Sequence, residues 1–319
     1  MQIITDSNVK IGDKIAVSVG VFDGVHIGHC HLLSELVRIA GSGGMASVAI
    51  TFENHPLEVI SRQSRPLSIT SLSRRLELIS ASGVEYCRIM KFTPALKEMN
   101  SLSFLNLLQA QFSIGAVVAG YNNAFGRCGD LSVEEATRKL DIAFHRASPV
   151  SVGGLEVSSS TIRKLLSECR IPIANKMLGR CFELEGTVVH GKAIGRTIGF
   201  PTANIDVDVK DSVIPGRGVY ACAAIIDNNN KEIYGAMVNI GDNPTVDEKG
   251  TLSIEAHLIG IPEGIDLYGH KLCLFFLDFM REECKFSSLD ALKRQLERDC
   301  KMAANIFDSS KISIFAKNK

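Results

Sequence analysis

The sequence lacks an excess of charge, a long apolar stretch and a paired cysteine motif. Lysine and arginine together number 35, as do aspartate and glutamate, so no overall field favours nucleic acid or an anionic membrane as a partner. No apolar stretch approaches the roughly 18 residues that a membrane span needs, and the first residues lack the basic start of a signal peptide. The nine cysteines form no C-x-x-C pair, which disfavours a disulfide framework or a zinc cluster. We therefore expect a soluble, cytoplasmic protein with reduced thiols.

The length of 319 residues predicts two domains, each with its own core. In the first half, apolar runs alternate with segments of helical period, which predicts a parallel sheet with helical crossovers. The expected strands are residues 14–21, 46–52, 86–91, 115–119 and 143–146, and the expected helices are residues 31–40, 72–82, 101–111 and 132–141. Ser132 and Glu135 have the spacing of a capping box at the start of the last helix.

The second half has a different sequence pattern, with short β-rich runs separated by Gly, Pro and Asn. The expected strands are residues 182–190, 218–226, 234–240, 252–259 and 271–280, with a hairpin turn at 227–231. This spacing predicts a small antiparallel barrel. A final amphipathic helix is expected to begin near Ser287, with Asp290 completing a capping box and Leu289, Leu292 and Leu296 on one face. We expect the domain boundary within residues 172–182 and divide the chain into residues 1–177 and 178–319.

The stretch GVFDGVHIGH at residues 20–29 carries the most chemical information. It joins an apolar run to a helical pattern, and its glycines let the backbone approach a ligand closely. The free amides and positive dipole end of a helix start attract an anion, and histidines there can donate to phosphate oxygens. The stretch therefore predicts an ATP site. The candidate residues are Gly20, Phe22, Asp23, Gly24, His26, Gly28 and His29.

Two alternatives remain for this stretch when it is taken alone. It can be an ordinary glycine turn. A metal cluster of His26, His29 and His31 is a second alternative, disfavoured because no carboxylate or Cys-x-x-Cys partner accompanies the histidines.

Two further segments of the first half look functional. The sequence TFENHP at 51–56 follows an expected strand, so it lies at the same edge of the sheet as the first motif. The sequence SSSTIR at 158–163 places hydroxyls and a guanidinium at a helix start, which suits a triphosphate clamp. A serine-rich helix start is also often only an N-cap.

Together these motifs resemble the HIGH-motif nucleotidylyltransferases, and among them the FAD synthetase module of bacterial bifunctional riboflavin kinase/FAD synthetases. The matching stretches are GVFDGVHIGH at 20–29, TFENHP at 51–56, VVAGYNNAFGRCGD at 117–130 and VSSSTIR at 157–163. The resemblance implies a Rossmann-like domain in which the FMN phosphate attacks the α-phosphorus of ATP and releases pyrophosphate, with Mg²⁺ bridging the phosphates. By this likeness His26 and His29 contact ATP phosphates, Ser159, Ser160 and Arg163 close over them, and Asn122 lies near the flavin or metal.

The chain departs from the pattern of this family at four positions. Thr161 occupies the first basic position of the usual clamp, and Asn54 replaces the usual proline before His-Pro. Asn123 and Ala124 stand where an aromatic residue and a polar or basic residue are common. These changes lead us to consider a weakened adenylyltransferase activity or an altered affinity for the flavin.

A second constellation lies in the sequence GTVVHGKAIGRTIGFPTAN at 186–204. It reads as a strand followed by a glycine-rich loop, which is no Walker A loop because no G-K-[ST] follows. Thr202 and Asn204 stand two residues apart, on one face if the segment is extended, and their oxygens can complete a Mg²⁺ shell with ATP phosphates. Glu255 is a carboxylate in an otherwise apolar strand, either exposed on the outer face or placed at a site, and His257 shares its strand face.

This half resembles the riboflavin kinase module over nearly its whole length. The matching stretches are GTVVHGKAIGRTIGFPTANI, GVYA at 218–221, VNIGDNPT at 238–245, IEAHLI at 254–259, DLYG at 266–269 and REECKF at 281–286. The resemblance implies that Glu255 is the general base for the ribityl 5′-hydroxyl and that Thr202 and Asn204 hold Mg²⁺ and phosphate. The other residues it implies in the site are Gly191, Lys192, Gly195, Arg196 and Asn239.

The two resemblances predict a bifunctional transferase that makes FMN from riboflavin and then FAD from FMN, with ATP as co-substrate in both steps. Its partners are then the small molecules riboflavin, FMN and ATP, with Mg²⁺ as cofactor. Two alternatives stay open: a riboflavin kinase with a weakened or lost FAD synthetase activity, and a flavin- or nucleotide-binding regulator without catalysis. The general base expected at Glu255 argues against the regulator, because binding alone needs no base.

Overall fold

The structure is a computed structural model that describes residues 1–5, 11, 14–60, 65–121, 131–191, 195, 198–227, 232–243, 251–262 and 264–317. The chain divides into two compact units, Met1–Ser159 and Ser160–Lys319. Within the described residues, no helix is both long and apolar enough to cross a membrane.

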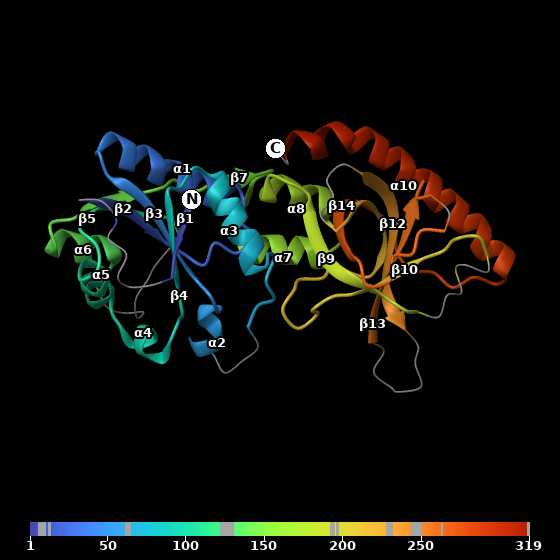
Figure 1. Cartoon of the computed structure of the whole chain (residues 1–319), viewed down its shortest axis with the longest axis horizontal. Coiled ribbons are helices and arrows are strands. Elements are labelled where there is room, and N and C mark those ends of the chain that lie inside the picture. Colours follow the sequence, from blue (N-terminus) through green and yellow to red (C-terminus); the bar gives the residue numbers. More distant parts are fainter. Residues whose placement is uncertain are drawn as a thin grey trace. The chain divides into compact units, whose positions relative to one another are not determined.

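The first unit is built on a six-stranded sheet with helices packed against it (Figure 1). The strand order is β1-β4-β3-β2-β5-β6, and every neighbouring pair is parallel. The strands are β1 (Gln2–Ile4), β2 (Ile15–Val19), β3 (Ala46–Phe52), β4 (Tyr86–Met90), β5 (Ile114–Ala119) and β6 (Ala143–Arg146). The helices are α1 (Ile27–Ser42), α2 (Pro56–Ile60), α3 (Leu72–Ala81), α4 (Pro94–Glu98), α5 (Ser101–Gln109) and α6 (Val133–Lys139), and β7 (Ser151–Val152) pairs with β8 (Leu155–Glu156) as a small separate hairpin.

Both faces of this sheet are buried, which is why its central strands read as continuous apolar runs. All five residues of β2 are buried. One hydrophobic cluster joins the sheet to α5 and α6, and a second joins it to α1 and α3. This packing fixes the carboxyl ends of β2 and β3, where the first two sequence motifs begin.

The second unit contains a barrel of antiparallel strands (Figure 1). The barrel is closed, and its strand order is β10-β13-β12-β11-β14-β9. The strands are β9 (Phe182–Val189), β10 (Ala203–Asp206), β11 (Gly218–Ile226), β12 (Ile233–Asn243), β13 (Thr251–Ile259) and β14 (Lys271–Arg281). Helices α7 (Ser159–Ser167) and α8 (Ile171–Leu178) precede the barrel, and α10 (Leu289–Lys317) follows it. Leu296, Ala303 and Phe307 of α10 pack in clusters with β11, β12 and β14.

The expected fold class is confirmed: a parallel α/β unit is followed by an antiparallel barrel and a terminal helix. The strands expected at residues 46–52, 143–146 and 218–226 have the predicted bounds, and the Ser132–Glu135 capping box is present. The short strands β1 and β10 were not predicted, because their few residues give too little alternation to identify. The expected turn at 227–231 lies mostly outside the described residues, and the boundary at residue 177 stays a prediction.

Two helix starts differ from expectation. Helix α1 begins at Ile27 rather than at residue 31, because the side chain of His26 caps it. The predicted capping box of Ser287 and Asp290 is wrong: the hydroxyl of Ser288 accepts a hydrogen bond from the Ala291 backbone N–H, and α10 starts at Leu289. The Leu289 side chain is exposed rather than on the buried face, since it occupies the first helical position.

Candidate active sites

The turn between β2 and α1 has a backbone that departs from ordinary extended or helical conformations. Phe22 and Val25 have positive φ angles of 53° and 33°, and Gly24 has a φ of 81°. The Phe22 and Val25 side chains are nevertheless buried in the cluster beneath α1, and this packing stabilises the unfavourable backbone. The result is a tight turn that places His26 at the N-cap of α1.

The two histidines of the motif stack on each other at this helix start. Their ring centroids lie 3.6 Å apart with an interplanar angle of 14°. The Phe22 ring packs against His29 in a T-shaped arrangement with a centroid distance of 5.4 Å. The Nδ1 atom of His26 accepts a hydrogen bond of 3.2 Å from the His29 backbone N–H. In its neutral form His26 therefore carries its proton on Nε2, and the ring can donate on the side opposite the cap.

His29 lies in an environment that opposes a charged imidazole. Burial, and then the positive charges of His26 and Arg75, lower the pKa of His29 well below its ordinary value. Its Nδ1 atom is buried without a hydrogen-bond partner. An unpaired lone pair costs less than an unpaired N–H donor in such a place, so the neutral ring carries its proton on Nε2.

Asp23 stabilises the turn through hydrogen bonds to the segment that precedes α3. Its buried carboxylate accepts hydrogen bonds from the backbone N–H groups of Ile69 at 3.0 Å and Thr70 at 3.2 Å, and the Thr70 hydroxyl accepts one from the Gly24 backbone N–H at 3.1 Å. The Ser159 hydroxyl donates to the backbone carbonyl of Asp23 at 2.9 Å. The structure therefore brings Ser159 to the motif turn, as the sequence suggested. Ser160, Thr161 and Arg163 follow in α7, and their roles stay predictions.

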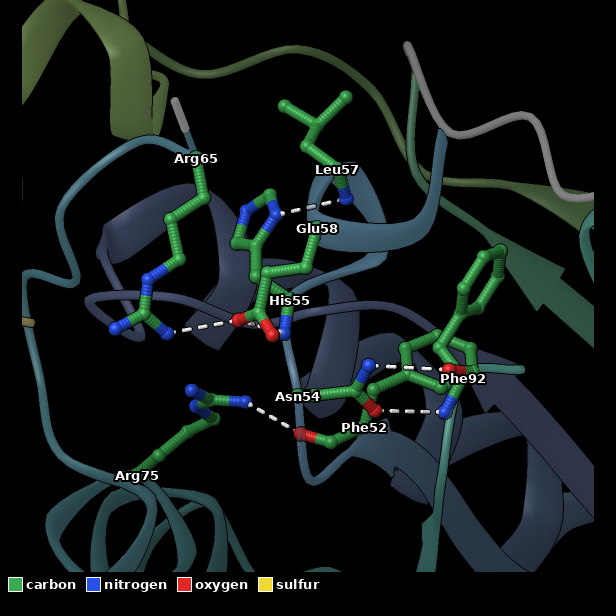
Figure 2. A network of polar contacts seen from close by, with 8 residues as sticks. All are labelled: Phe52, Asn54, His55, Leu57, Glu58, Arg65, Arg75 and Phe92. Atoms are coloured by element: carbon green, nitrogen blue, oxygen red, sulfur yellow. Dashed lines mark hydrogen bonds and ion pairs between the residues drawn. The ribbon is translucent and has the colours of Figure 1, made fainter. Parts of the chain in front are cut away.

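The TFENHP segment leaves the end of β3 as a hydrogen-bonded network (Figure 2). The Asn54 amide donates to the Phe92 carbonyl at 3.0 Å and accepts from the Phe92 backbone N–H at 2.8 Å. This pair continues the β3–β4 pairing beyond its last backbone partners, so the chain accommodates asparagine where the family usually has proline. His55 accepts from the Leu57 backbone N–H, and Glu58 binds both the His55 backbone N–H and Arg65.

Sequence reasoning missed Arg75, which lies beside this network (Figure 2). Its Nη1 atom donates to the Phe52 carbonyl at 3.0 Å and to the Thr51 hydroxyl at 3.4 Å, and the Thr51 hydroxyl donates to the Val21 carbonyl at 3.0 Å. Arg75 is only 6% exposed. Its spacing of four residues from the buried Ile79 on α3 is the signal that would have identified it, since a cation on the apolar face of a helix needs a reason.

In the barrel, Glu255 occupies the middle of a row of polar residues on three adjacent strands. It lies directly opposite Asn204 of β10 on one side and opposite Asn239 of β12 on the other. Opposed residues of antiparallel strands share a face, so the three side chains project from the same outer face of the barrel. Ile254 and Ala256 are buried on either side of Glu255 in sequence.

Hydroxyl groups orient the Glu255 carboxylate. Thr202 donates to its Oε2 atom at 3.3 Å and Ser253 donates to its Oε1 atom at 3.3 Å. His257, on the same face, contacts the Pro201 carbonyl through Nδ1 at 2.8 Å. Thr202, Asn204 and Glu255, predicted from separate motifs, are therefore brought together.

Glycines of the loop before β10 allow close packing at this site. A Cβ atom at Gly191 would collide with the side-chain amide of Asn204, and one at Gly195 would collide with the Phe200 carbonyl. Asn239 donates to Glu283 at 3.2 Å. The hydroxyl, amide and carboxylate oxygens gathered here are ligands that suit Mg²⁺. The predicted site residues Asn122, Lys192 and Arg196, and the departures Asn123 and Ala124, lie outside the described residues.

Comparison with known proteins assigns a family to each half of the chain. Residues 9–161 match the family model described as FAD synthetase, and residues 178–307 match the one described as riboflavin kinase. The chain is 32% identical over 300 residues to the bifunctional riboflavin kinase/FMN adenylyltransferase of Listeria monocytogenes, covering 93% of both chains. It is 33% identical over 299 residues to the enzyme of the same name from Escherichia coli K12, covering 92% of this chain and 93% of that one.

A solved structure supports the same layout. A crystal structure from Streptococcus pneumoniae, named as a macrolide-efflux protein, superposes with a TM-score of 0.85 at 27% identity, covering 96% of this chain and 99% of that chain. The two modules define a transferase that acts on flavins. The chain belongs to the family of bifunctional riboflavin kinase/FMN adenylyltransferases, and the resemblance inferred from its motifs is confirmed.

Proposed function

We propose that this chain phosphorylates riboflavin at the Glu255 site of the barrel. The ribityl 5′-hydroxyl oxygen attacks the γ-phosphorus of ATP, the bond from that phosphorus to the bridging oxygen breaks, and ADP leaves. Glu255 accepts the hydroxyl proton. The single observation that carries this assignment is the row of Asn204, Glu255 and Asn239 on adjacent strands, with the Thr202 hydroxyl on the carboxylate.

In this proposal Thr202 and Asn204 would hold Mg²⁺, which when bound neutralises charge on the ATP phosphates. Asn239 frames the carboxylate from the opposite strand. The glycine-rich loop that contains Gly191, Lys192, Gly195 and Arg196 lies next in sequence to these ligands and is proposed to cover the phosphates. The collision that a Cβ at Gly191 would make with Asn204 supports a site that depends on glycine there.

The second activity is proposed for the turn at residues 20–29. The FMN phosphate attacks the α-phosphorus of ATP and pyrophosphate leaves, with no covalent enzyme intermediate. The start of α1 and the Nε2–H donors of His26 and His29 bind the triphosphate. Ser159, Ser160 and Arg163 complete the clamp. Gly20, Phe22, Asp23, Gly24 and Gly28 shape the turn. For Asn122, which lies outside the described residues, the proposed role is to bind near the flavin or the metal.

The experiment is to incubate the pure protein with ATP, Mg²⁺ and either riboflavin or FMN, and to separate the flavins by chromatography. FMN from riboflavin and FAD from FMN are the expected products. Accumulation of FMN without FAD, even with added FMN, would support the alternative of a weakened adenylyltransferase and contradict the second assignment. Absence of both products would contradict the whole proposal.

We also propose that this two-step pathway takes place in the cytoplasm, with riboflavin, FMN and ATP as the partners of the protein. No nucleic acid or membrane takes part. The balanced charge of the chain, 35 basic against 35 acidic residues, supports this assignment.

A further inference from the structure

Arg75 is a buried cation that the proposed reactions do not use. It comes from α3 and reaches the end of β3, where its guanidinium binds the Phe52 carbonyl (Figure 2). The same guanidinium also donates to the Thr51 hydroxyl. Through Thr51 this contact extends to the carbonyl of Val21, within the adenylylation motif. One side chain therefore connects the two sequence motifs that follow β2 and β3.

The charge of Arg75 is poorly compensated in the described structure. Its Nε atom is buried without a hydrogen-bond partner, and burial lowers the pKa of Arg75 below its ordinary value, opposed by the carboxylate of Asp23. Burying a guanidinium with an unsatisfied donor costs free energy. A fixed positive charge near a triphosphate site can offset this cost, because its field strengthens the binding of a polyanion.

The groups that act on His29 come from two directions. His26 faces it within the motif, and Arg75 acts on it from α3, both lowering the pKa of His29. Asp23 acts on Arg75 from the motif loop and Cys87 acts on it from β4. Phe22 contributes a T-shaped ring contact to His29. Arg75 thus favours the neutral form of the imidazole that we assign to ATP.

We infer that Arg75 is a positioning residue for adenylyl transfer: through the Phe52 carbonyl and the Thr51 hydroxyl, its buried guanidinium holds the ends of β2 and β3 in register, and it supplies a positive charge that acts on the motif histidines and attracts the ATP triphosphate. Arg75 acts through its neighbours and touches no substrate. The inference rests on the proposed adenylyl transfer at the residue 20–29 turn, and it adds a residue that neither motif contains.

The test compares three variants in FMN adenylylation, with kcat/KM for ATP measured as a function of pH. Arg75→Gln removes the charge, so the pKa of His29 is expected to rise; its side chain is two bonds shorter than that of arginine, so it also loses the hydrogen bond from Nη1 to the Phe52 carbonyl. The acid limb of the profile is then expected to move to higher pH by about one unit, with a loss of about tenfold in kcat/KM near neutral pH. Arg75→Lys retains the charge, and its acid limb is expected to stay at the wild-type pH.

Arg74→Gln is the matched control, because Arg74 is the next residue on α3 but forms an ion pair with Glu77 at the surface. Its profile is expected to equal that of the wild type. An unmoved acid limb in Arg75→Gln would overturn the inference, since a purely structural role changes rate without shifting a titration. If Arg75→Gln does not fold, Arg75→Lys takes its place. An acid limb at higher pH than in the wild type then overturns the inference, and an acid limb at the wild-type pH supports it. Failure of the wild type to make FAD would instead contradict the proposed function.

Discussion

Replacing Glu255 by glutamine tests the assignment of the kinase base directly. Glutamine retains the shape of the side chain and an oxygen that can accept from Thr202 or Ser253, whose hydrogen bonds to Glu255 are 3.3 Å long. Hydrogen bonds of this length contribute little, so we expect the free energy of unfolding to change by about 1 kcal/mol or less. Residue 255 keeps its place between Asn204 and Asn239, because its strands are held by backbone pairing.

The catalytic effect is expected to be far larger than the effect on stability. A general base is typically worth about 10²- to 10⁴-fold in rate, equivalent to about 2.7–5.4 kcal/mol of barrier at 1.36 kcal/mol for each tenfold change. The assay measures FMN formed from riboflavin and, separately, FAD formed from FMN, and only the first is expected to fall. Ser253→Ala is the matched control, since it removes one contact to the carboxylate and leaves the base.

The reasoning would be refuted if Glu255→Gln phosphorylated riboflavin within about tenfold of the wild-type rate while its fold was intact. A loss of both activities in a folded variant would refute the separate assignment of two sites.

Four further outcomes are expected. His29→Ala should abolish FAD formation from FMN while riboflavin phosphorylation continues at the wild-type rate, and the reverse pattern would contradict the assignment of the two sites. Gly191→Ala should slow riboflavin phosphorylation by about tenfold or more, because the new methyl group displaces the Asn204 amide; unchanged kinetics would show that this amide is not needed. Because folding lowers the pKa of His29, the unfolded chain binds more protons than the folded one as pH falls below 6.5. The free energy of unfolding should therefore decrease there by up to about 1.4 kcal/mol per pH unit, and denaturant titrations of His29→Gln should lack this contribution. Ser288→Ala should lower the free energy of unfolding by about 0.5–2 kcal/mol through the lost cap of α10, measured by denaturant unfolding with both activities preserved.

The sequence predicted the elements whose residues are buried on a regular period. The strand at residues 46–52 and the helices built on buried leucines follow from such patterns. It missed β10, whose four residues alternate only twice. It also placed the start of α1 too late, because a histidine is not among the usual N-cap residues. Local patterns therefore identified the long elements but not those set by one side-chain contact.

The candidate sites were predicted to a different extent in the two units. The spacing of Thr202 and Asn204, and for Glu255 the resemblance to riboflavin kinases, predicted one site from stretches about 50 residues apart, and strand pairing brings these residues together. No local pattern indicated that Arg75 reaches the end of β3, because that contact depends on how α3 packs on the sheet. The hydrogen bonds of Asn54 to Phe92 were likewise beyond sequence reasoning, since they join two strand ends.

The N-cap of α1 restricts which amino acid can occupy position 26. Serine, threonine, asparagine and aspartate are the better helix caps, but their side chains are short and their polar atoms all lie close to the backbone. A neutral imidazole has an acceptor on one side of the ring for the His29 backbone N–H and a donor on the other side for an anion. A substitution by a better helix cap would therefore remove the donor that we propose binds ATP. The requirements of helix stability and of nucleotide binding thus oppose each other at position 26.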